Sequence, residues 1–209
     1  ELVKPQADWQ ALDVATGAGH TALTFAPHVA HVIASDLTEA MVNKAAELAE
    51  NRGLTNVETK SADAEALPFD DNSFDLVTCR IAAHHFPHPK QAYNEFARVL
   101  KPGGVLGFTD NITVPDKQAA GYYNAYEKLR DPSHNWIYPL ARLQAMFEKA
   151  GFQVEATRQL SKEMEFQQWT DRMRVSDRDK EKLLEMMRNI PDALKPLFAP
   201  RWADGTMYF

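Results

Sequence analysis

Short apolar runs alternate with helical patterns along the first half of the chain. Runs of strand length stand at 11–14, 31–35, 57–61, 74–80 and 104–109. Helical spacing of apolar residues falls between them, at 21–27, 38–52 and 90–100. Strands and helices that alternate in this way predict βαβ units, in a mainly parallel sheet with helices on both faces. Such sheets bind ligands beyond the carboxyl ends of their strands, where the strand order reverses.

Two of these helices show their buried face in the sequence. In the segment 38–52, Thr38 is the expected N-cap, and Met41, Ala45 and Leu48 fall on one face. In the segment 90–100 we expect four apolar residues to point inward: Ala92, Phe96, Val99 and Leu100. Both helices would pack on the sheet through these faces.

The pattern changes after residue 110. Helices are predicted over 116–130, 139–150, 166–175 and 176–189, and a strand is predicted over 152–159. Ser176, followed by Asp179 three residues later, indicates a variant of the capping box. Trp169 and Trp202 are expected in the core of this part. We interpret 1–112 as an α/β core, and 113–209 as a helical cap that also completes the sheet, within one structural domain.

Composition narrows the class of protein. The chain has 209 residues, a net charge of −6 and one cysteine. This charge, without a basic run, argues against nucleic acid as a partner. A single cysteine excludes an internal disulfide framework and a cysteine-based zinc site. The sequence has no apolar stretch of membrane-spanning length and no signal-peptide core at its start, so we expect a cytoplasmic protein.

A glycine-containing turn follows the first predicted strand. Gly17, Gly19 and Ala22 satisfy the G-x-G-x-x-G/A fingerprint, in which glycines let backbone N–H groups approach a ligand closely. Asp36 follows the second strand, where a carboxylate would accept hydrogen bonds from ribose hydroxyls. The two features indicate a nucleoside in the crevice without naming it. The alternative is a tight turn that holds no ligand.

Further motifs identify the type of nucleoside. The turn LDVATGAG (12–19) and Asp36 are followed by DAEALPF (63–69), FDLV (74–77) with a pair of histidines, and LKPGG (100–104). Their order resembles that of the class I S-adenosylmethionine (SAM)-dependent methyltransferases, and most of all the ubiquinone/menaquinone-biosynthesis type and its small-molecule relatives. The resemblance covers residues 11–110. It implies a Rossmann-like, doubly wound fold and methyl transfer from SAM, with S-adenosylhomocysteine (SAH) as the product.

The resemblance also implies which residues bind SAM. Asp13 would lie below the methionine amino group, Asp36 would bind the ribose, and Asp63 would accept from the adenine amino group. The other expected contacts are Ala15, Gly17, Gly19, Leu37, Met41, Ala64, Arg80 and Ala82. Leu37 would pack on the adenine. Ala15 departs from the family, because it replaces the first glycine of the turn. Taken without the resemblance, Asp63 is equally well explained as a helix N-cap.

Histidines after the fourth strand are candidates for a general base. His84 and His85 would lie at the carboxyl end of that strand, and histidine titrates in the range that suits a base. The alternative is a structural role, which we favour for His88. A base is needed only where the nucleophile arrives protonated. No carboxylate stands at ligand spacing to these histidines, so we expect no metal site.

A second candidate region lies in the cap, where the family places its acceptor-binding insertion. Tyr122, Tyr126, Arg130 and Trp136 are expected to bind the acceptor, and His134 is a further catalytic candidate. Polar groups flanked by aromatic rings would suit a planar or carboxylated substrate. The alternative is a helix–helix connection in which the segment 130–134 braces the cap.

The leading hypothesis is therefore a methyltransferase that acts on O, N or C of a small molecule. The alternatives are a nicotinamide-dependent oxidoreductase and a SAM-binding protein with other chemistry. The oxidoreductase would leave LKPGG and the Asp63 segment without a role. The motif positions suggest a trimmed form of a longer enzyme. We expect the family's seventh, antiparallel strand to be missing or truncated. The sequence leaves the oligomeric state open.

Overall fold

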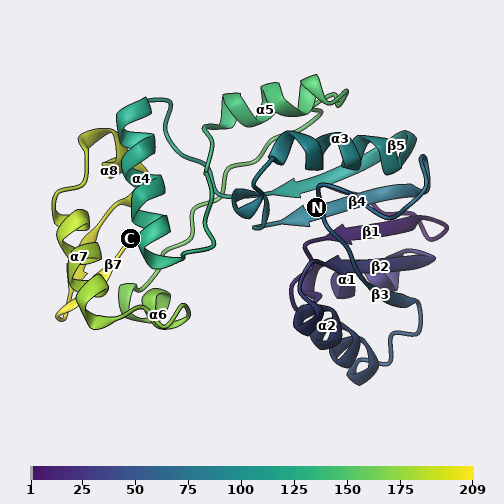
Figure 1. Ribbon diagram of the computed structural model, residues 1–209, viewed down its shortest axis with the longest axis horizontal. Coiled ribbons are helices and arrows are strands. Elements are labelled where there is room, and N and C mark those ends of the chain that lie inside the picture. Colours follow the sequence, from purple (N-terminus) through teal and green to yellow (C-terminus); the bar gives the residue numbers. More distant parts are fainter. Residues whose placement is uncertain (1) are drawn as a thin grey trace. The chain divides into compact units, whose positions relative to one another are not determined.

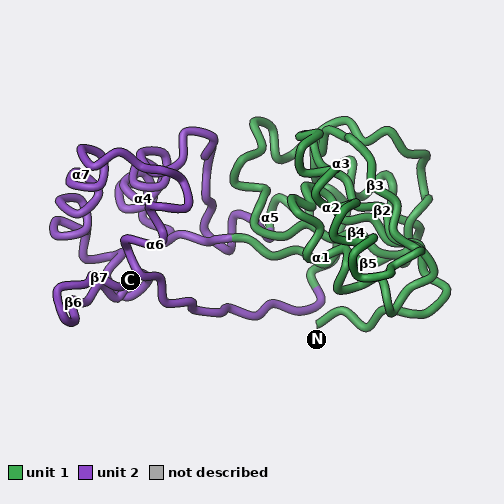
Figure 2. The backbone as a smooth tube through the Cα atoms, turned by 90° about the horizontal axis from the view of Figure 1, so that it is seen from below, with its two compact units in different colours: residues 1–110, 145–154 green, residues 111–144, 155–209 purple. Residues whose placement is uncertain are grey.

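The computed structural model describes residues 2–209 and divides into two compact units (Figures 1 and 2). Unit 1 contains the residues up to Asp110 together with Ala145–Val154. Unit 2 contains Asn111–Gln144 and Glu155–Phe209. The change from one unit to the other after Asp110 falls two residues from the boundary expected from the sequence.

Unit 1 is built on a five-stranded parallel sheet in the order β3-β2-β1-β4-β5. The strands are β1 (Gln10–Val14), β2 (His31–Asp36), β3 (Val57–Ser61), β4 (Phe74–Arg80) and β5 (Leu100–Thr109). All five strands predicted in the first half of the chain are present. The chain moves outward from β1 to β3 and then returns to the other side of β1 as β4. The strand order therefore reverses between β1 and β4, where ligands of such sheets bind.

Helices connect the strands as βαβ units. They are α1 (His20–Phe25), α2 (Glu39–Asn51) and α3 (Pro89–Val99), with short 3-10 turns η1 (Ala26–His28) and η2 (Ala83–His85). Because such crossovers are right-handed, the reversal of strand order places α1 and α2 on one face of the sheet and α3 on the other. The four residues expected to point inward from α3 and its end are buried: Ala92, Phe96, Val99 and Leu100.

The buried face of α2 differs from the one expected. Val42, Ala45 and Ala49 are buried, whereas Met41 is 38% exposed. A small residue is required at position 45, because the glycine turn after β1 packs on Ala45. A Cβ atom placed on Gly19 would lie 3.0 Å from the Cβ of Ala45. This close approach leaves no room for a larger side chain at position 45.

The glycine turn requires a left-handed backbone at three positions. Gly17 has φ +54° and Gly19 has φ +84°. Ala15, which replaces the family's first glycine, has φ +53°. The substitution therefore keeps the path of the turn and adds backbone strain, since an L-residue other than glycine is disfavoured in this region.

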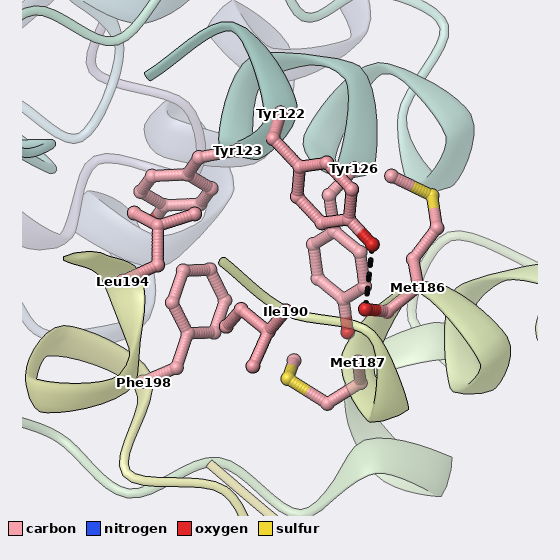
Figure 3. A pocket seen from close by; sticks show the side chains of 8 residues that line it. All are labelled: Tyr122, Tyr123, Tyr126, Met186, Met187, Ile190, Leu194 and Phe198. Carbon is pink, nitrogen blue, oxygen red and sulfur yellow. Dashed lines mark hydrogen bonds between the residues drawn. The ribbon is translucent and has the colours of Figure 1, made fainter. Parts of the chain in front are cut away.

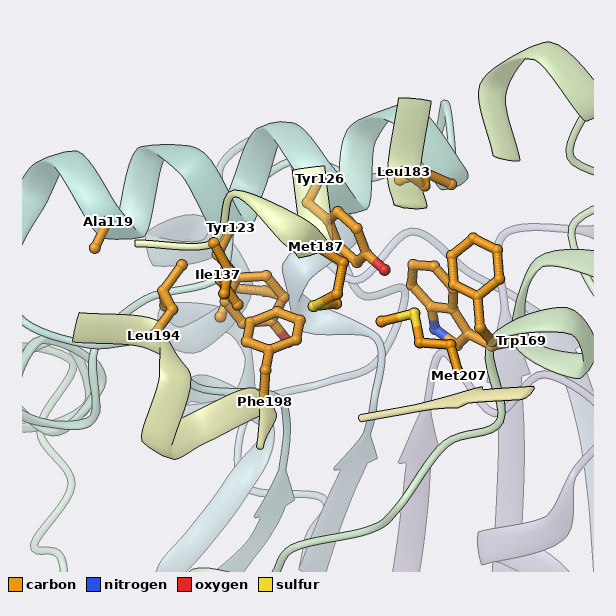
Figure 4. Packing of buried hydrophobic residues seen from close by; sticks show 12 residues of the cluster. Ala119, Tyr123, Tyr126, Ile137, Trp169, Leu183, Met187, Leu194, Phe198 and Met207 are labelled. Atoms are coloured by element: carbon orange, nitrogen blue, oxygen red, sulfur yellow. The ribbon is translucent and has the colours of Figure 1, made fainter. Parts of the chain in front are cut away.

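Unit 2 is a helical bundle around an aromatic core (Figure 4). Its helices are α4 (Lys117–Arg130), α6 (Phe166–Asp171), α7 (Asp177–Arg188), η3 (Asp192–Leu194) and α8 (Lys195–Phe198). Helix α5 (Leu140–Lys149) begins in unit 2 and ends in unit 1. Tyr126 stacks on Trp169 in this core, with ring centroids 5.2 Å apart. Trp169 is buried, as expected.

Three details of the second half correct or confirm expectations. The strand predicted over 152–159 does not form. Apolar and polar residues alternate there, but the segment packs neither face on the core, and Val154 is 37% exposed. Trp202 is not in the core; it is 54% exposed and lies beside Arg188. The N-cap half of the expected capping box is present, since Ser176 Oγ accepts from the Asp179 backbone N–H at 3.2 Å, and the same hydroxyl donates to the Asp179 carboxylate at 2.8 Å.

The chain ends in an antiparallel hairpin of β6 (Arg201–Ala203) and β7 (Thr206–Tyr208). This hairpin forms its own two-stranded sheet. Within residues 2–209, the main sheet contains no sixth or seventh strand. No helix in the same range is both long and apolar enough to cross a membrane.

The two glycines of the turn provide a matched test of its geometry. Gly17→Ala meets no atom within 4 Å and adds only left-handed strain, so we expect a loss of about 1 kcal/mol in the free energy of unfolding. Gly19→Ala adds the same strain and crowds Ala45 on α2, so we expect about 3 kcal/mol. Urea denaturation measures both. Equal losses would contradict the close packing of the turn on α2.

Two tyrosines of unit 2 provide a second matched pair (Figure 3). Within residues 2–209, the buried hydroxyl of Tyr126 has no hydrogen-bond partner. The hydroxyl of Tyr122 donates to the backbone carbonyl of Met186 at 2.6 Å. We expect Tyr126→Phe to raise the free energy of unfolding by about 1 kcal/mol, and Tyr122→Phe to lower it by a similar amount. Thermal and urea unfolding check this. A destabilised Tyr126→Phe would show that its hydroxyl is bonded in solution.

Candidate functional site

A buried carboxylate lies at the carboxyl end of β1. Asp13 is 2% exposed and lies opposite Thr78 of β4 in the strand register. Its Oδ1 accepts from the Thr78 hydroxyl at 2.5 Å, and its Oδ2 accepts from the Thr16 hydroxyl at 2.5 Å and from the Ala22 backbone N–H at 3.2 Å. Asp13 therefore joins β1, β4, the glycine turn and the start of α1.

Burial dominates the titration of this carboxyl group. Removal from water raises the pKa of Asp13 from its ordinary value of 3.8 to about 6, although the hydrogen bonds from Thr16 and Thr78 oppose the rise. A protonated Asp13 is thus favoured by the folded state well above the pH at which an exposed aspartate ionises.

The carboxylate of Asp36 binds backbone N–H groups of the glycine turn and of the segment before α2. Its Oδ2 accepts from the Gly17 backbone N–H and its Oδ1 from the Thr38 backbone N–H, each at 2.9 Å. The Asp36 backbone carbonyl accepts from the Ala62 N–H at 3.0 Å. The turn after β1, the end of β2 and the segment after β3 are thus fastened to one residue.

Apolar side chains stand exposed beside Asp36. Leu37 is 71% exposed and Met41 is 38% exposed. A carboxylate next to exposed apolar side chains matches a nucleoside, which presents a diol and a flat, weakly polar base. Gly17 leaves open space where a Cβ atom would stand. These residues therefore fit the cofactor expected from the sequence.

The segment after β3 forms a turn and not a helix. Asp63 is exposed, and its Oδ1 accepts from the Glu65 backbone N–H at 2.9 Å. Its backbone carbonyl accepts from the Ala66 N–H at 3.1 Å, while Ala64 is buried. The helix N-cap considered for Asp63 is therefore wrong, although its side chain does cap a local turn. Adenine binding by Asp63 stays a prediction.

The segment after β4 begins with a strained residue. Arg80 is exposed, and Ala82 is buried. Between them, Ile81 is 44% exposed and has φ +53°, which a β-branched residue rarely adopts. The Ile81 N–H donates to the Thr109 carbonyl at 2.7 Å, so the left-handed residue turns the chain where pairing with β5 ends. Strain of this kind is common at functional sites.

His84 forms a close pair with an aspartate that follows β5. Its Nδ1 lies 2.6 Å from Oδ1 of Asp110, and its backbone N–H donates to Oδ2 of the same carboxylate at 2.9 Å. Both side chains are largely buried, with exposures of 10% for His84 and 4% for Asp110. The His85 ring lies against that of His84, with centroids 4.2 Å apart. The contact with Asp110 is made by His84.

Five candidate residues lie in unit 2. His134 is 1% exposed, and its Nε2 lies 2.9 Å from Oδ1 of the buried Asn124. The guanidinium group of Arg130 lies over the Trp169 ring, 4.4 Å from its centroid. Tyr126 belongs to the core. Tyr122 is half-buried and Trp136 is 41% exposed. The contacts of Arg130 and His134 are those of the bracing alternative, and acceptor binding by these residues stays a prediction.

Sequence reasoning missed Asp110 and Thr78. The signal for Asp110 was its position directly after the fifth predicted strand, because an acidic residue at the carboxyl end of a strand was also the argument for Asp36. Thr78 offered no signal, because the strand register that places it opposite Asp13 is not readable from spacing. In the described part of the chain, no group of three or more potential ligands would hold a metal ion.

The raised pKa of Asp13 predicts a pH dependence of stability. Because the folded-state pKa lies above the unfolded one, the contribution of Asp13 is complete below pH 3.8 and is lost as pH rises through about 6. The difference corresponds to about 3 kcal/mol. Asp13→Asn keeps the shape and cannot ionise.

Urea denaturation of both proteins between pH 4 and 8 measures the effect. We expect the difference in the free energy of unfolding, wild type minus Asp13→Asn, to fall as pH rises towards 6 and to level off above it. Subtraction removes the titration of all other groups. A difference that is independent of pH would contradict a raised pKa at Asp13.

Comparison with known proteins gives a consistent result. A family model described as a methyltransferase domain matches residues 12–108. The uncharacterised methyltransferase YcgJ of Bacillus subtilis is 38% identical over 177 residues, which is 84% of this chain and 70% of YcgJ. A demethylmenaquinone methyltransferase of Listeria monocytogenes is 31% identical over 173 residues, 73% of each chain.

Solved structures agree with the sequence matches. The crystal structure of YcgJ superposes with a TM-score of 0.95 at 32% identity, and covers 100% of this chain and 90% of YcgJ. A protein of Bacillus halodurans C-125, provisionally described as a methyltransferase, gives a TM-score of 0.93 at 38% identity, and covers 99% and 91% of the two chains.

These findings confirm the Rossmann-like fold and SAM as the methyl donor, and they give no support to the oxidoreductase alternative. The chain belongs to the class I SAM-dependent methyltransferases.

Proposed function

We propose that this methyltransferase acts on a small molecule whose nucleophilic atom arrives protonated, with His84 as general base and Asp110 as the residue that orients it. The observation that supports this proposal is the contact of 2.6 Å between His84 Nδ1 and Asp110 Oδ1. A carboxylate at this distance favours the tautomer with the proton on Nδ1. The lone pair of the neutral ring is then on Nε2.

The second contact of Asp110 fixes the direction of the ring. One carboxylate oxygen accepts from the His84 backbone N–H at 2.9 Å while the other faces Nδ1. The residue is thus held at two points, and its side chain cannot turn without loss of a hydrogen bond. Such pre-orientation is what a general base requires, since proton transfer depends on distance and alignment.

The methyl donor and the protein side chains would contribute different parts of the reaction. Bound SAM supplies an electrophilic methyl group on a positively charged sulfur. His84 Nε2 would take the proton from the nucleophilic oxygen, nitrogen or carbon of the acceptor. That atom would bond to the methyl carbon while the bond between this carbon and sulfur breaks and SAH leaves. The Asp110 carboxylate would stabilise the imidazolium ion that results. The glycine turn, Asp36 and Leu37 would hold the donor, so that acceptor and methyl carbon meet in line.

The relatives favour a class of acceptor. Demethylmenaquinone methyltransferases are named for a quinone-type substrate. A phenol or quinol loses a proton from oxygen and then becomes nucleophilic both at that oxygen and at ring carbons. One base therefore serves O-methylation and C-methylation alike. We propose a hydroxylated aromatic compound as the acceptor of this chain.

The test measures transfer of a labelled methyl group from SAM to a panel of phenols and hydroquinones. We expect His84→Gln and Asp110→Asn to lower kcat by about 10²-fold or more. His85→Gln is the matched comparison, because it removes the neighbouring ring and keeps the pair, and we expect less than about a tenfold loss. Alkaline pH is expected to recover part of the lost rate, since the acceptor then ionises without a base.

Binding of SAH by calorimetry separates catalysis from cofactor binding. We expect the same dissociation constant for all three variants within about threefold, because none of these side chains is expected to contact the cofactor. Full turnover of His84→Gln at neutral pH would overturn the proposed base. Transfer to amines alone would overturn the proposed acceptor class and keep the enzyme class.

A further inference from the structure

Glu65 links two segments at the carboxyl edge of the sheet. Its side chain is 13% exposed and lies in the turn 63–66 after β3. One carboxylate oxygen accepts from the His88 backbone N–H at 2.5 Å, and the other lies 3.0 Å from His88 Nδ1. His88 is the N-cap of α3, and its own side chain does not cap the helix. The carboxylate of Glu65 instead binds the backbone N–H of the N-cap residue itself, from outside the helix.

The turn that carries Glu65 is fastened on its other side to the cofactor site. The Asp63 carboxylate accepts from the Glu65 backbone N–H at 2.9 Å. The Ala62 N–H donates to the Asp36 carbonyl at 3.0 Å. A group that binds at Asp36 and Asp63 would thus displace the short, hydrogen-bonded turn 63–66, which contains Glu65.

The segment that receives Glu65 carries His84 at its other end. Residues 82–86 form a compact turn, in which His85 N–H donates to Ala82 at 2.9 Å and Phe86 N–H to Ala83 at 3.1 Å. Asp110 holds the segment at His84, and Glu65 holds it at His88. Because the turn between these two points is short, a shift of His88 would reach His84.

We infer that Glu65 is a positioning residue, which couples cofactor binding in the turn 63–66 to the placement of His84. It would touch neither cofactor nor acceptor. The inference rests on the proposed function, because it takes His84 as the base and this turn as part of the adenine site. Its contribution does not come from simple ion pairing, since His88 is 66% exposed and exposed pairs contribute little.

Nuclear magnetic resonance of protein with labelled histidine rings tests the coupling. His84 is assigned from the spectrum of His84→Gln, and SAH is the ligand. In the wild type we expect SAH to shift the ring resonances of His84. In Glu65→Ala, which removes both contacts with His88, we expect at least half of that shift to disappear, while SAH still binds with an affinity within about tenfold of wild type. His88→Ala removes only the ring contact and keeps the backbone N–H, so we expect it to lose less of the shift than Glu65→Ala.

Glu58→Ala is the matched control. It removes another glutamate that faces a histidine, His31, at 3.9 Å, with the pair at the opposite end of β2. We expect the His84 response to SAH to stay unchanged in this variant. If Glu65→Ala fails to fold, Glu65→Gln keeps an oxygen for the His88 backbone N–H and alters only the ring contact. It is expected to fold and to show a reduced response.

Three outcomes would overturn the inference. The first is a wild-type protein in which SAH does not shift the ring resonances of His84. The second is a full shift in Glu65→Ala. The third is loss of SAH binding in both Glu65 variants, which would mean that Glu65 is needed for cofactor binding itself. Failure of the proposed function has a different signature. In that case His84→Gln keeps full turnover, while the SAH response of His84 and its dependence on Glu65 persist.

Discussion

The hydrogen bond between Asp13 and Thr78 joins the two strands at which the order of the sheet reverses. The glycine turn and the start of α1 are fastened to this pair. The same carboxylate accepts from Thr16 in the glycine turn and from the first turn of α1. A carboxyl group this deeply buried weakens the fold when it ionises. The protein thus keeps a costly group at the point where the crevice opens, and three donors hold the crevice in shape.

Backbone strain marks the same edge. Ala15 and Ile81 are both left-handed, and each follows directly on the end of a central strand. Ala15 replaces a glycine without a change in the path of the turn, so the surrounding hydrogen bonds must impose that path. Ile81 turns the chain from β4 into the histidine segment. In both places the fold tolerates the strained residue because hydrogen bonds between strands and to carboxylates fix the backbone on either side of it.

The sheet was predictable from the sequence because each of its strands is a separate apolar run, and the motif order then gave the strand connections. The strand expected at 152–159 failed for the opposite reason. The alternation of apolar and polar residues is a local property of the sequence. It does not indicate whether a sheet edge is available for the segment to pair with. The α2 face was misjudged because the spacing favoured Met41 and Leu48, whereas Val42 and Ala49 are buried beside Ala45. Asp110 was missed because its role depends on His84, which is distant in sequence.

The acidic residues of the carboxyl edge share one design. Asp13, Asp36, Glu65 and Asp110 each follow or close a strand of the sheet, and each accepts hydrogen bonds from a segment attached to a different strand. Loops that follow different strands of the sheet are joined to one another by these hydrogen bonds. Asp36, Glu65 and Asp110 each accept from a backbone N–H of the other segment, so these three links depend on main-chain position. The link from Asp13 to β4 depends on the Thr78 hydroxyl. A change at one loop is therefore transmitted as a displacement of backbone, which reaches His84 from two sides.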